Sequence, residues 1–433
     1  MVYQEWGFRR SPFDTTSLPA SEIGSQLLKG RDKEVAQLMR RISTGPKLAT
    51  LEGLNGVGKT SVANVAAFRL FESHLEGGDG ALFVPCKKVF QLDADQDLQT
   101  FIDGVLMEVA QTLIERAKDI YRADGKSIST THLDRWLNSP QLKTYNAAGL
   151  GFQLGANVET NTSSGFQSSG LRKIVFEWLQ SVFPSQEDGG VVCIIDNLEL
   201  LQSSDRARGL LEALRDELFN VRGLRWVLCG ALGIVHGVVA SPRLEGYLHN
   251  PVEVGGIDAT FAPAILDSRV QSTAARDNTY LPLISSDFGR LFEVLRGNLR
   301  SVLGQADNYC QWVADRSLPL TDEEKHALFE TWLLEQAELA HVSVKRALGP
   351  RAWSVFTKAV EIGGLFSPSD FEQFGFNSIP ALRPHIRDLE ATGVMVSTQD
   401  DGDKRRKTIQ ITPKGWLVDL AEQAGRPKLF PNG

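Results

Sequence analysis

A complete phosphate-binding motif stands at Gly53–Thr60, with the residues GLNGVGKT. It fits the pattern G-x-x-x-x-G-K-[ST] at every position, and it lies between a predicted strand, Lys47–Glu52, and a predicted helix, Ser61–Glu72. Glycines let such a loop fold around phosphates, while its amides and the helix N-terminus supply positive potential. The motif therefore predicts binding of a nucleoside triphosphate, and we expect ATP with Mg²⁺.

Two side chains of the motif have separate expected tasks. Lys59 reaches the β and γ phosphates in such a loop, and Thr60 ligates Mg²⁺. The residues predicted to hold the nucleotide are the motif itself and the residue after it: Gly53, Leu54, Asn55, Gly56, Val57, Gly58, Lys59, Thr60 and Ser61.

A carboxylate that can share the metal ion follows a second apolar strand. Val191–Ile195 has no charged residue, as is typical of a strand buried in a parallel sheet, and Asp196 follows it directly. We predict that Asp196 is the second protein ligand of Mg²⁺ and a catalytic residue. An apolar strand that ends in Asp is common by itself, so this prediction depends on the phosphate motif upstream.

Alternating strands and helices must position these residues. Other short apolar strands are predicted at Ala81–Pro85, Arg225–Cys229 and Pro251–Val254. Helices are predicted between and beside them at Asp97–Ala117, Leu171–Val182, Gly209–Phe219 and Ile234–Leu248. This alternation predicts an α/β domain with a largely parallel sheet.

A helical region is expected after about Asp258. Its predicted helices are Phe261–Ala274, Phe288–Leu295 and Leu299–Ala314, and a further helical region starts at Pro319 and Asp322. A different composition, rich in Gly, Asn, Ser and Thr, marks Asn146–Ser169, where a hairpin and a mobile insertion both remain open.

The C-terminal part has the pattern of a winged helix. Predicted helices at Ala352–Glu361, Ser367–Phe374 and Ser378–Thr392 precede two predicted strands, Val394–Thr398 and Thr408–Thr412, joined by a charged turn. Pro384 falls inside the third helix and is expected to kink it or delay its start. The pattern resembles bacterial winged-helix regulators.

A winged helix can bind DNA or dock onto a protein, and both remain open. For DNA, the third helix would enter the major groove and the charged turn would meet phosphates. The residues predicted to contact duplex DNA are Arg383, His385 and Arg387 on the helix, and Lys404, Arg405, Arg406 and Lys407 in the wing.

Composition bounds the class of protein. The 433 residues are 42% hydrophobic and 23% charged, as is typical of a globular protein. At ~150 residues for each domain, this length predicts about three domains. The net charge of −7 divides unevenly: residues 341–433 carry 13 basic and 10 acidic residues, which weakly favours contact of this part with nucleic acid or an acidic partner. No apolar run is long enough for a membrane span, and the N-terminus lacks a signal peptide's apolar core, so a cytoplasmic location is expected.

Other classes of site find no support in the residue spacing. Cys86, Cys193, Cys229 and Cys310 are widely separated, which disfavours both a zinc site and a disulfide framework and predicts buried thiols. No spacing of His, Ser and carboxylates indicates a hydrolase triad.

From Phe8 to Ala314 the sequence resembles AAA+ ATPases of the origin-recognition initiator type and the related STAND signalling NTPases. Besides the two motifs above, the resemblance rests on Ser11-Pro12-Phe13, on Gly30-Arg31-Asp32-Lys33-Glu34 and on Gly297-Asn298-Leu299-Arg300. It implies that Arg31 lies beside the adenine and that Arg300 touches the γ phosphate from a helical lid. It also implies that Arg243 lies where an arginine finger acts on a neighbouring subunit, although an ordinary exposed arginine would have the same sequence.

Two departures from the family pattern bear on hydrolysis. Most active relatives follow the Asp with a water-activating Glu, whereas Asn197 follows Asp196 here. Glu199, two positions further on, is the candidate catalytic carboxylate. The strand Arg225–Cys229 ends in Cys229-Gly230, without the polar sensor residue of the family. Both departures favour a slow switch over a motor.

These observations predict three domains: a P-loop ATPase domain at residues 1–256, a helical lid at 257–318 and a winged-helix domain at 319–433. The favoured hypothesis is a homo-oligomeric switch in which ATP controls contact with double-stranded DNA. The alternatives are a STAND-like regulator that binds a protein effector and a loader or transposition-type ATPase.

Overall fold

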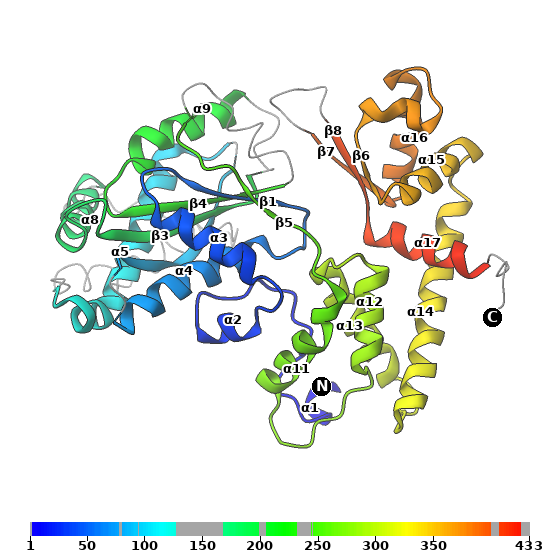
Figure 1. Cartoon of the computed structure of the whole chain (residues 1–433). Coiled ribbons are helices and arrows are strands. Elements are labelled where there is room, and N and C mark those ends of the chain that lie inside the picture. Colours follow the sequence, from blue (N-terminus) through cyan, green and yellow to red (C-terminus); the bar gives the residue numbers. More distant parts are fainter. Residues whose placement is uncertain are drawn as a thin grey trace, which may run out of the picture.

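The computed structural model describes residues 2–77, 80–93, 95–126, 168–198, 205–231, 244, 246–399 and 407–425. Figure 1 shows an α/β part, a group of helices beside it, and a smaller part that carries both α16 and a second sheet. The stretch predicted at Asn146–Ser169 lies outside the described residues up to position 167, and the predicted helix Ile234–Leu248 lies mostly outside them.

The α/β part contains a five-stranded parallel sheet of order β2-β3-β4-β1-β5. This confirms the predicted P-loop α/β fold. The strands are β1 (Ala49–Gly53), β2 (Leu82–Gln91), β3 (Gly189–Asp196), β4 (Leu224–Gly230) and β5 (Val252–Val254).

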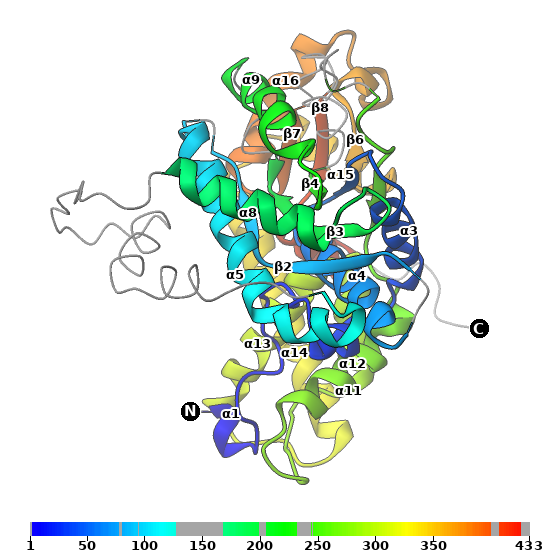
Figure 2. The same ribbon diagram turned by 90° about the vertical axis from the view of Figure 1, so that its left-hand side faces the viewer.

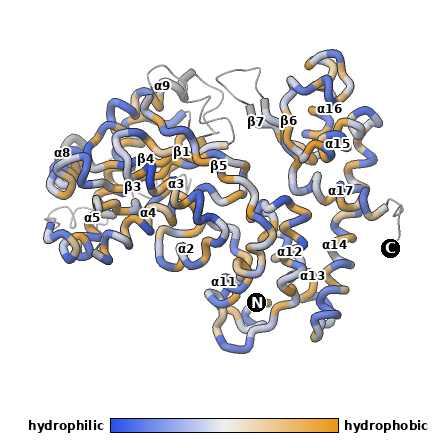
Figure 3. Tube along the Cα trace, in the orientation of Figure 1, coloured by the Kyte–Doolittle hydropathy of each residue, from blue (hydrophilic) through white to orange (hydrophobic). Residues whose placement is uncertain are grey.

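Helices cover both faces of this sheet, because successive side chains of each strand point to opposite faces. In β4, Val227 packs with the helices of one face and Leu228 with those of the other. One face carries α2 (Glu22–Leu27), α3 (Asp32–Ser43) and α4 (Lys59–Leu75), and the other carries α5 (Leu98–Asp124), α8 (Ser168–Val182) and α9 (Asp205–Leu214). Figure 3 shows the strands mostly in hydrophobic colours, as burial on both faces requires.

Three elements of this part differ from the sequence expectation. β2 runs to Gln91 because an irregularity between Pro85 and Val89 lets the strand continue past two lysines. α5 runs to Asp124, where Gly125 ends it with a φ of 67°. α9 ends at Leu214, and the remainder of the expected helix is a π-helical turn, Arg215–Phe219.

The helical lid consists of a short 3-10 turn, Ala259–Phe261, followed by α11 (Ala262–Thr273), α12 (Ser285–Val294) and α13 (Leu299–Ala314). The chain's first residues belong to the same core. Helix α1 (Val2–Glu5) lies beside the lid helices in Figures 1 and 2, and Tyr3, Phe8 and Phe13 are buried in one cluster with Phe288.

Helix α14 (Asp322–Lys345) begins where the sequence predicted a helical region and joins the lid to the C-terminal module. Thr321 and Glu324 cap its start reciprocally. Phe329 and Trp332 near its start are buried in the lid core, whereas Val344 near its end is buried in the core of the next module. One helix therefore belongs to both cores, so the domain boundaries stay a prediction.

The C-terminal module has the order of helices and strands that the winged-helix prediction requires. It contains α15 (Pro350–Glu361), a 3-10 helix at Pro368–Phe374, α16 (Ile379–Ala391), and a three-stranded antiparallel sheet of order β6-β8-β7. The strands are β6 (Leu365–Phe366), β7 (Met395–Gln399) and β8 (Lys407–Ile411), and helix α17 (Pro413–Gly425) follows.

Three sequence expectations about this module were wrong or incomplete. Pro384 does not delay α16, which begins at Ile379, and the carbonyl that loses its donor lies in the first turn at Pro380. The second helix has 3-10 form, with non-helical dihedral angles at Asp370. Neither β6 nor α17 was expected. A strand of two residues, such as β6, is too short to show a pattern in the sequence.

Two further expectations concern composition. All four cysteines are buried thiols, as predicted. Among the described residues, the helices are all too short or too polar to cross a bilayer.

Candidate nucleotide-binding site

The phosphate loop lies between the end of β1 and the start of α4, as predicted. Gly56 and Gly58 have φ values of 86° and 97°, which residues other than glycine rarely adopt. A Cβ atom at Gly56 would lie 2.6 Å from Oδ1 of Asn298. α4 begins at Lys59, so the unpaired amides of its first turn face the loop and favour an anion.

Lys59 is folded back into this loop and is only 6% exposed. Its Nζ donates to the carbonyl oxygens of Gly53, at 3.0 Å, and Leu54, at 3.2 Å. Phosphate oxygens carry more charge than these carbonyls and are therefore stronger acceptors for an ammonium group. The lysine is thus held beside the place where a phosphate chain would enter.

Thr60 and Asp196 meet although 136 residues separate them. Thr60 Oγ1 donates to Asp196 Oδ2 at 2.6 Å, and the amide of Asn197 donates to Asp196 Oδ1 at 2.9 Å. Asn197 has a φ of 57°, a left-handed conformation that asparagine tolerates. A hydroxyl and a carboxylate at this spacing fit Mg²⁺, which takes few protein oxygens and completes its shell with water and phosphate.

The cleft in front of the loop has a volume of about 360 Å³. Its phosphate end includes Asn197 and also Gln91, which is in register with Asp196 on the neighbouring strand. Sequence reasoning missed Gln91, because β2 was expected to end at Pro85. Gln91 is a polar residue at the same edge of the sheet as the end of β4. The family's polar sensor residue was expected at the end of β4, but β4 ends in Cys229 and Gly230.

The other end of the cleft is lined by aliphatic side chains, and this composition suits a nucleobase. They come from the N-terminal segment, from α2 and the residue after it, and from the lid: Leu18, Leu27, Leu28, Ile257, Ile265, Leu299 and Leu303. The cleft therefore runs from a polar phosphate end to an apolar end between the N-terminal segment and the lid.

Arg31 lines this cleft, but its guanidinium is engaged by protein groups. It is 3% exposed; Nη1 pairs with Glu34 at 2.8 Å, and Nη2 donates to the carbonyls of Val57, at 3.0 Å, and Gly255, at 2.6 Å. Arg31 therefore ties the phosphate loop to the end of β5. Its predicted place beside the adenine stays a prediction, whereas its bracing of the loop was not foreseen.

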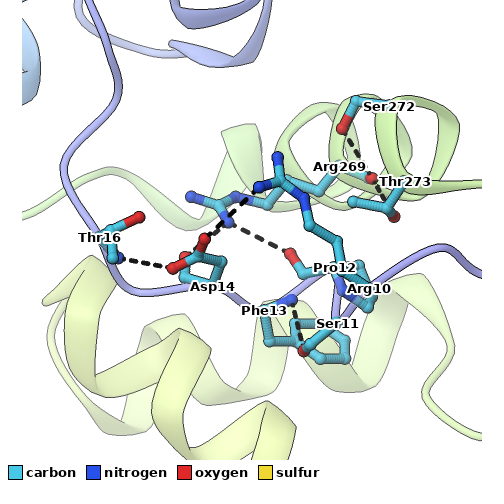
Figure 4. Close-up of polar contacts among 9 residues, drawn as sticks. All are labelled: Arg10, Ser11, Pro12, Phe13, Asp14, Thr16, Arg269, Ser272 and Thr273. Carbon is cyan, nitrogen blue, oxygen red and sulfur yellow. Dashed lines mark hydrogen bonds and ion pairs between the residues drawn. The ribbon is translucent and has the colours of Figure 1, made fainter.

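Arg269 of α11 is a second buried arginine at the cleft, and sequence reasoning missed it. Figure 4 shows its guanidinium reaching the N-terminal segment, where Nη1 donates to the carbonyls of Pro12, at 3.2 Å, and Asp14, at 2.9 Å. Burial lowers its pKa to about 10. Its position four residues after Ile265, on the buried face of the helix, was the signal available in the sequence.

The lid contacts the phosphate loop directly. Asn298 caps α13 through its Oδ1, and its Nδ2 donates to the carbonyl of Asn55 at 2.8 Å. The amide of Arg300 donates to the carbonyl of Gly56 at 3.1 Å, and its exposed side chain lines the cleft. The backbone of Arg300 thus contacts the phosphate loop, and the contact of its side chain with the γ phosphate stays a prediction.

The same lid turn contacts the winged-helix module. The guanidinium of Arg296 lies over the ring of Trp416 in α17, 4.6 Å from its centroid. A cavity of about 250 Å³ is lined by all three parts: by Asn55 of the phosphate loop, by Asn298 of the lid, and by Val396, Gln410 and Trp416 of the C-terminal module. Phosphate loop, lid and wing strands therefore meet at one place.

The residues predicted for DNA that the structure describes do not line the cleft. Arg383 and Arg387 are exposed on α16, while His385 is half-buried with its ring 5.3 Å from that of Phe376. Lys407 begins β8, and Lys404, Arg405 and Arg406 lie outside the described residues. Glu199 and Arg243 also lie outside them.

Comparison with protein-family models and with curated proteins finds no match. Among solved structures, the chain is similar to the Orc1 protein of Aeropyrum pernix in complex with DNA, at 13% identity and a TM-score of 0.44, over 96% of this chain and 98% of that one. It is also similar to the Orc2 protein of Aeropyrum pernix in ADPNP and ADP complexes, at 14% identity and a TM-score of 0.47, over 96% and 97%.

A Walker-type ATPase of Pyrococcus abyssi is similar at 14% identity and a TM-score of 0.46, over 94% of this chain and 99% of that one. These likenesses extend over nearly the whole of each chain.

Proposed function

We propose that the chain is a nucleotide-controlled switch that binds ATP with Mg²⁺ and passes the state of its phosphate loop to the winged-helix module. The observation that carries the proposal is the hydrogen bond of 2.6 Å from Thr60 to Asp196 at the mouth of a complete phosphate loop. Bound Mg²⁺ would offset phosphate charge at this pair.

The lid turn Arg296–Arg300 contacts both the phosphate loop and the winged-helix module, so it can couple nucleotide binding to that module. Asn298 and the amide of Arg300 hold two carbonyls of the phosphate loop, and Arg296 in the same turn holds Trp416. Any rearrangement of the loop around phosphates must therefore act on a turn that also supports α17. A ligand shifts such an equilibrium only as far as it prefers one of the two states.

Slow hydrolysis belongs to the same proposal. Asn197, which follows Asp196, is an amide and cannot accept a proton from water as a carboxylate can. Gln91 beside it can orient a water molecule by hydrogen bonds but has the same limitation. We therefore propose that turnover is slow and that occupancy by ATP is the signal.

The primary test is ATP binding by the wild-type chain and by Lys59→Ala, measured by calorimetry with Mg²⁺ present. We expect Lys59→Ala to weaken ATP binding at least about tenfold, because a charge-assisted contact is lost. Lys47→Ala, at an exposed lysine before β1, is the matched control and should bind as wild type does. Equal affinity of the wild type and Lys59→Ala for ATP would reject the nucleotide site.

Binding of duplex DNA through α16 is the proposed output. Arg383 and Arg387 are both exposed on this helix, and arginine is the residue best suited to phosphate and guanine contacts. We expect Arg383→Ala with Arg387→Ala to weaken duplex binding and reduce its dependence on salt. Arg346→Ala, at an exposed arginine directly after α14, is the matched control.

A gel-shift series across salt concentrations, with and without ATP, separates the outcomes. Retardation by the wild type that changes with ATP supports the switch. Absence of any retardation would reject DNA as the output and leave a protein effector as the partner to be sought. Size-exclusion chromatography of the same mixtures tests whether ATP also drives formation of a homo-oligomer.

A further inference from the structure

The N-terminal segment from Pro12 to Leu18 forms part of the apolar end of the cleft. Thr15, Thr16, Ser17 and Leu18 line it, and the segment is fixed at both of its ends. Leu18 is held by Ser61 and Asn64 of α4: the amide of Leu18 donates to Ser61 at 3.0 Å, and Asn64 donates to the Leu18 carbonyl at 2.8 Å. This end is therefore tied to the phosphate loop's own helix.

The other end of the segment is held by the lid, through Arg269. This side chain is 6% exposed and donates to the carbonyls of Pro12 and Asp14. Its Nε is buried without a hydrogen-bond partner among the described residues. Burial of a cation is costly unless hydrogen bonds compensate for the lost hydration, and here the described compensation comes from the carbonyls of Pro12 and Asp14.

Between these two anchors, Asp14 shapes the turn that faces the cleft. Its Oδ1 accepts a hydrogen bond from the amide of Thr16 at 2.9 Å, while Arg10 approaches the other carboxylate oxygen at 3.9 Å (Figure 4). This backbone bond is the main reason why the pKa of Asp14 lies below its usual value. Three exposed hydroxyl residues, Thr15, Thr16 and Ser17, follow the turn along the rim of the cleft.

We propose that Arg269 is a positioning residue for the nucleobase: it fixes Pro12–Ser17 along the apolar end of the cleft, and this segment makes the protein select a purine nucleotide. The inference deepens the proposed function and rests on it. A purine fits better than a pyrimidine because its larger apolar faces can contact Leu18 and Leu27 as well as Ile265 and Leu303. Backbone groups and hydroxyls at Thr15–Ser17 can then meet its polar edge.

Arg269 should affect contacts with the base but not those with the phosphates. Binding of ATP, CTP and inorganic tripolyphosphate is therefore measured by calorimetry with Mg²⁺. Arg269→Met keeps the volume but leaves both carbonyls without their donor. We expect it to weaken ATP binding about tenfold, to leave tripolyphosphate within about twofold of wild type, and to lower the ratio of ATP to CTP affinity. Arg269→Lys keeps a buried cation and should restore part of the ATP affinity.

Arg276→Met is the matched control. Arg276 also donates to a backbone carbonyl near the N-terminus, that of Glu5 at 3.0 Å, but it contacts neither Pro12–Leu18 nor the cleft in the described contacts. The control should bind all three ligands as the wild type does. Equal losses of ATP and tripolyphosphate in Arg269→Met would show that Arg269 supports the whole cleft, and no loss of either would show that it has no role; both results overturn the proposal.

Asp14→Ala decides the question if Arg269→Met does not fold. Its side chain is 40% exposed, so its replacement leaves the lid core intact. We expect the same selective weakening of ATP, about two- to tenfold, because the turn that presents Thr15–Ser17 is lost. Failure of the proposed function has a different signature, since ATP would then bind wild type and Lys59→Ala alike.

Discussion

At the scale of single residues, the hydrogen bond from Thr60 to Asp196 is the contact that points most directly to a metal ion. Asp196 is 8% exposed, and both of its carboxylate oxygens accept a hydrogen bond from a neighbour. A carboxylate fixed in this way presents its charge in one direction, which suits coordination of a small cation. The pair was predicted from two motifs, and their meeting depends on the sheet that places β3 beside β4 and β4 beside β1.

Replacing Thr60 tests this pair. Thr60→Val keeps the shape of the side chain and removes the hydroxyl that donates to Asp196. We expect ATP affinity in the presence of Mg²⁺ to fall at least about tenfold, while affinity in the presence of EDTA stays the same. Calorimetry under both conditions measures the difference, and an equal loss with and without the metal would contradict a role for Thr60 in holding Mg²⁺.

His326 and Asp287 form a second pair, between α14 and the lid helix α12. The histidine Nδ1 lies 2.6 Å from Asp287 Oδ1, and this hydrogen bond raises the pKa of His326. Burial raises the pKa of Asp287. In both groups the folded state holds its proton more tightly than the unfolded state does, so their contribution is present at low pH and is lost as the pH rises through the folded-state pKa.

We therefore expect the melting temperature to fall between pH 6 and pH 8.5, through the range in which a histidine with a raised pKa loses its proton. His326→Gln keeps a hydrogen-bond donor that does not titrate and should flatten this dependence. Thermal unfolding of both proteins in a common buffer series is the measurement. An identical pH slope in the two proteins would count against this origin.

At the scale of elements, the sequence predicts what a periodic pattern encodes. Strand β3 and helix α13 were placed to within two residues, because a continuous apolar run and an Asn298 cap are visible in the letters alone. The continuation of β2 past Lys87 was not predicted, because the strand passes through an irregularity that breaks its alternation of residues. Gln91 was consequently missed as a residue of the cleft.

The same limit explains why Arg31 and Arg269 were not understood from the sequence. Each arginine binds carbonyl oxygens of segments far away in the chain, such as Gly255 for Arg31 and Pro12 for Arg269. Carbonyl partners leave no trace in residue types. Only the burial of a charged residue on an apolar helix face, as at Arg269, signals that such partners exist.

The turn at Gly56 gives a prediction at this scale. An alanine there would have to adopt a φ of 86°, and its Cβ would collide with Asn298. We expect Gly56→Ala to cost about 1–3 kcal/mol in the free energy of unfolding and to weaken ATP binding. Chemical denaturation and calorimetry measure the two effects.

Gly104→Ala is the control for this change. Gly104 lies in α5, and a Cβ there would meet nothing within 4 Å. We expect this variant to be about 0.5–1 kcal/mol more stable than the wild type and to bind ATP normally. Equal behaviour of the two alanine variants would contradict the role assigned to the turn.

At the scale of the whole molecule, Arg296 joins the lid to the winged-helix module beside the phosphate loop. Arg296 has a left-handed backbone, with a φ of 53°, and its guanidinium covers Trp416. Arg296→Asn removes the cation but tolerates this backbone. We expect it to loosen the module, seen as faster limited proteolysis near α17 and a larger radius of gyration by small-angle X-ray scattering.

Arg316→Asn is the matched control. Arg316 makes a similar contact, 3.6 Å from the ring centroid of Trp312, but the two residues belong to the lid alone. This variant should leave proteolysis and scattering unchanged. If Arg296→Asn also behaves as the wild type does, the contact with Trp416 does not hold the module.

Helix α14 gives the arrangement a mechanical property. It is a single helix of 24 residues, rooted in the lid core at Phe329 and Trp332 and in the winged-helix core at Val344. Along its length α17 packs against it, and His341 meets Glu422 at 2.6 Å. A helix of this length spans about 36 Å, so a tilt of about ten degrees at the lid displaces its far end by about 6 Å. Such a tilt of the lid would therefore move the winged-helix module by about the spacing between neighbouring phosphates of a DNA strand.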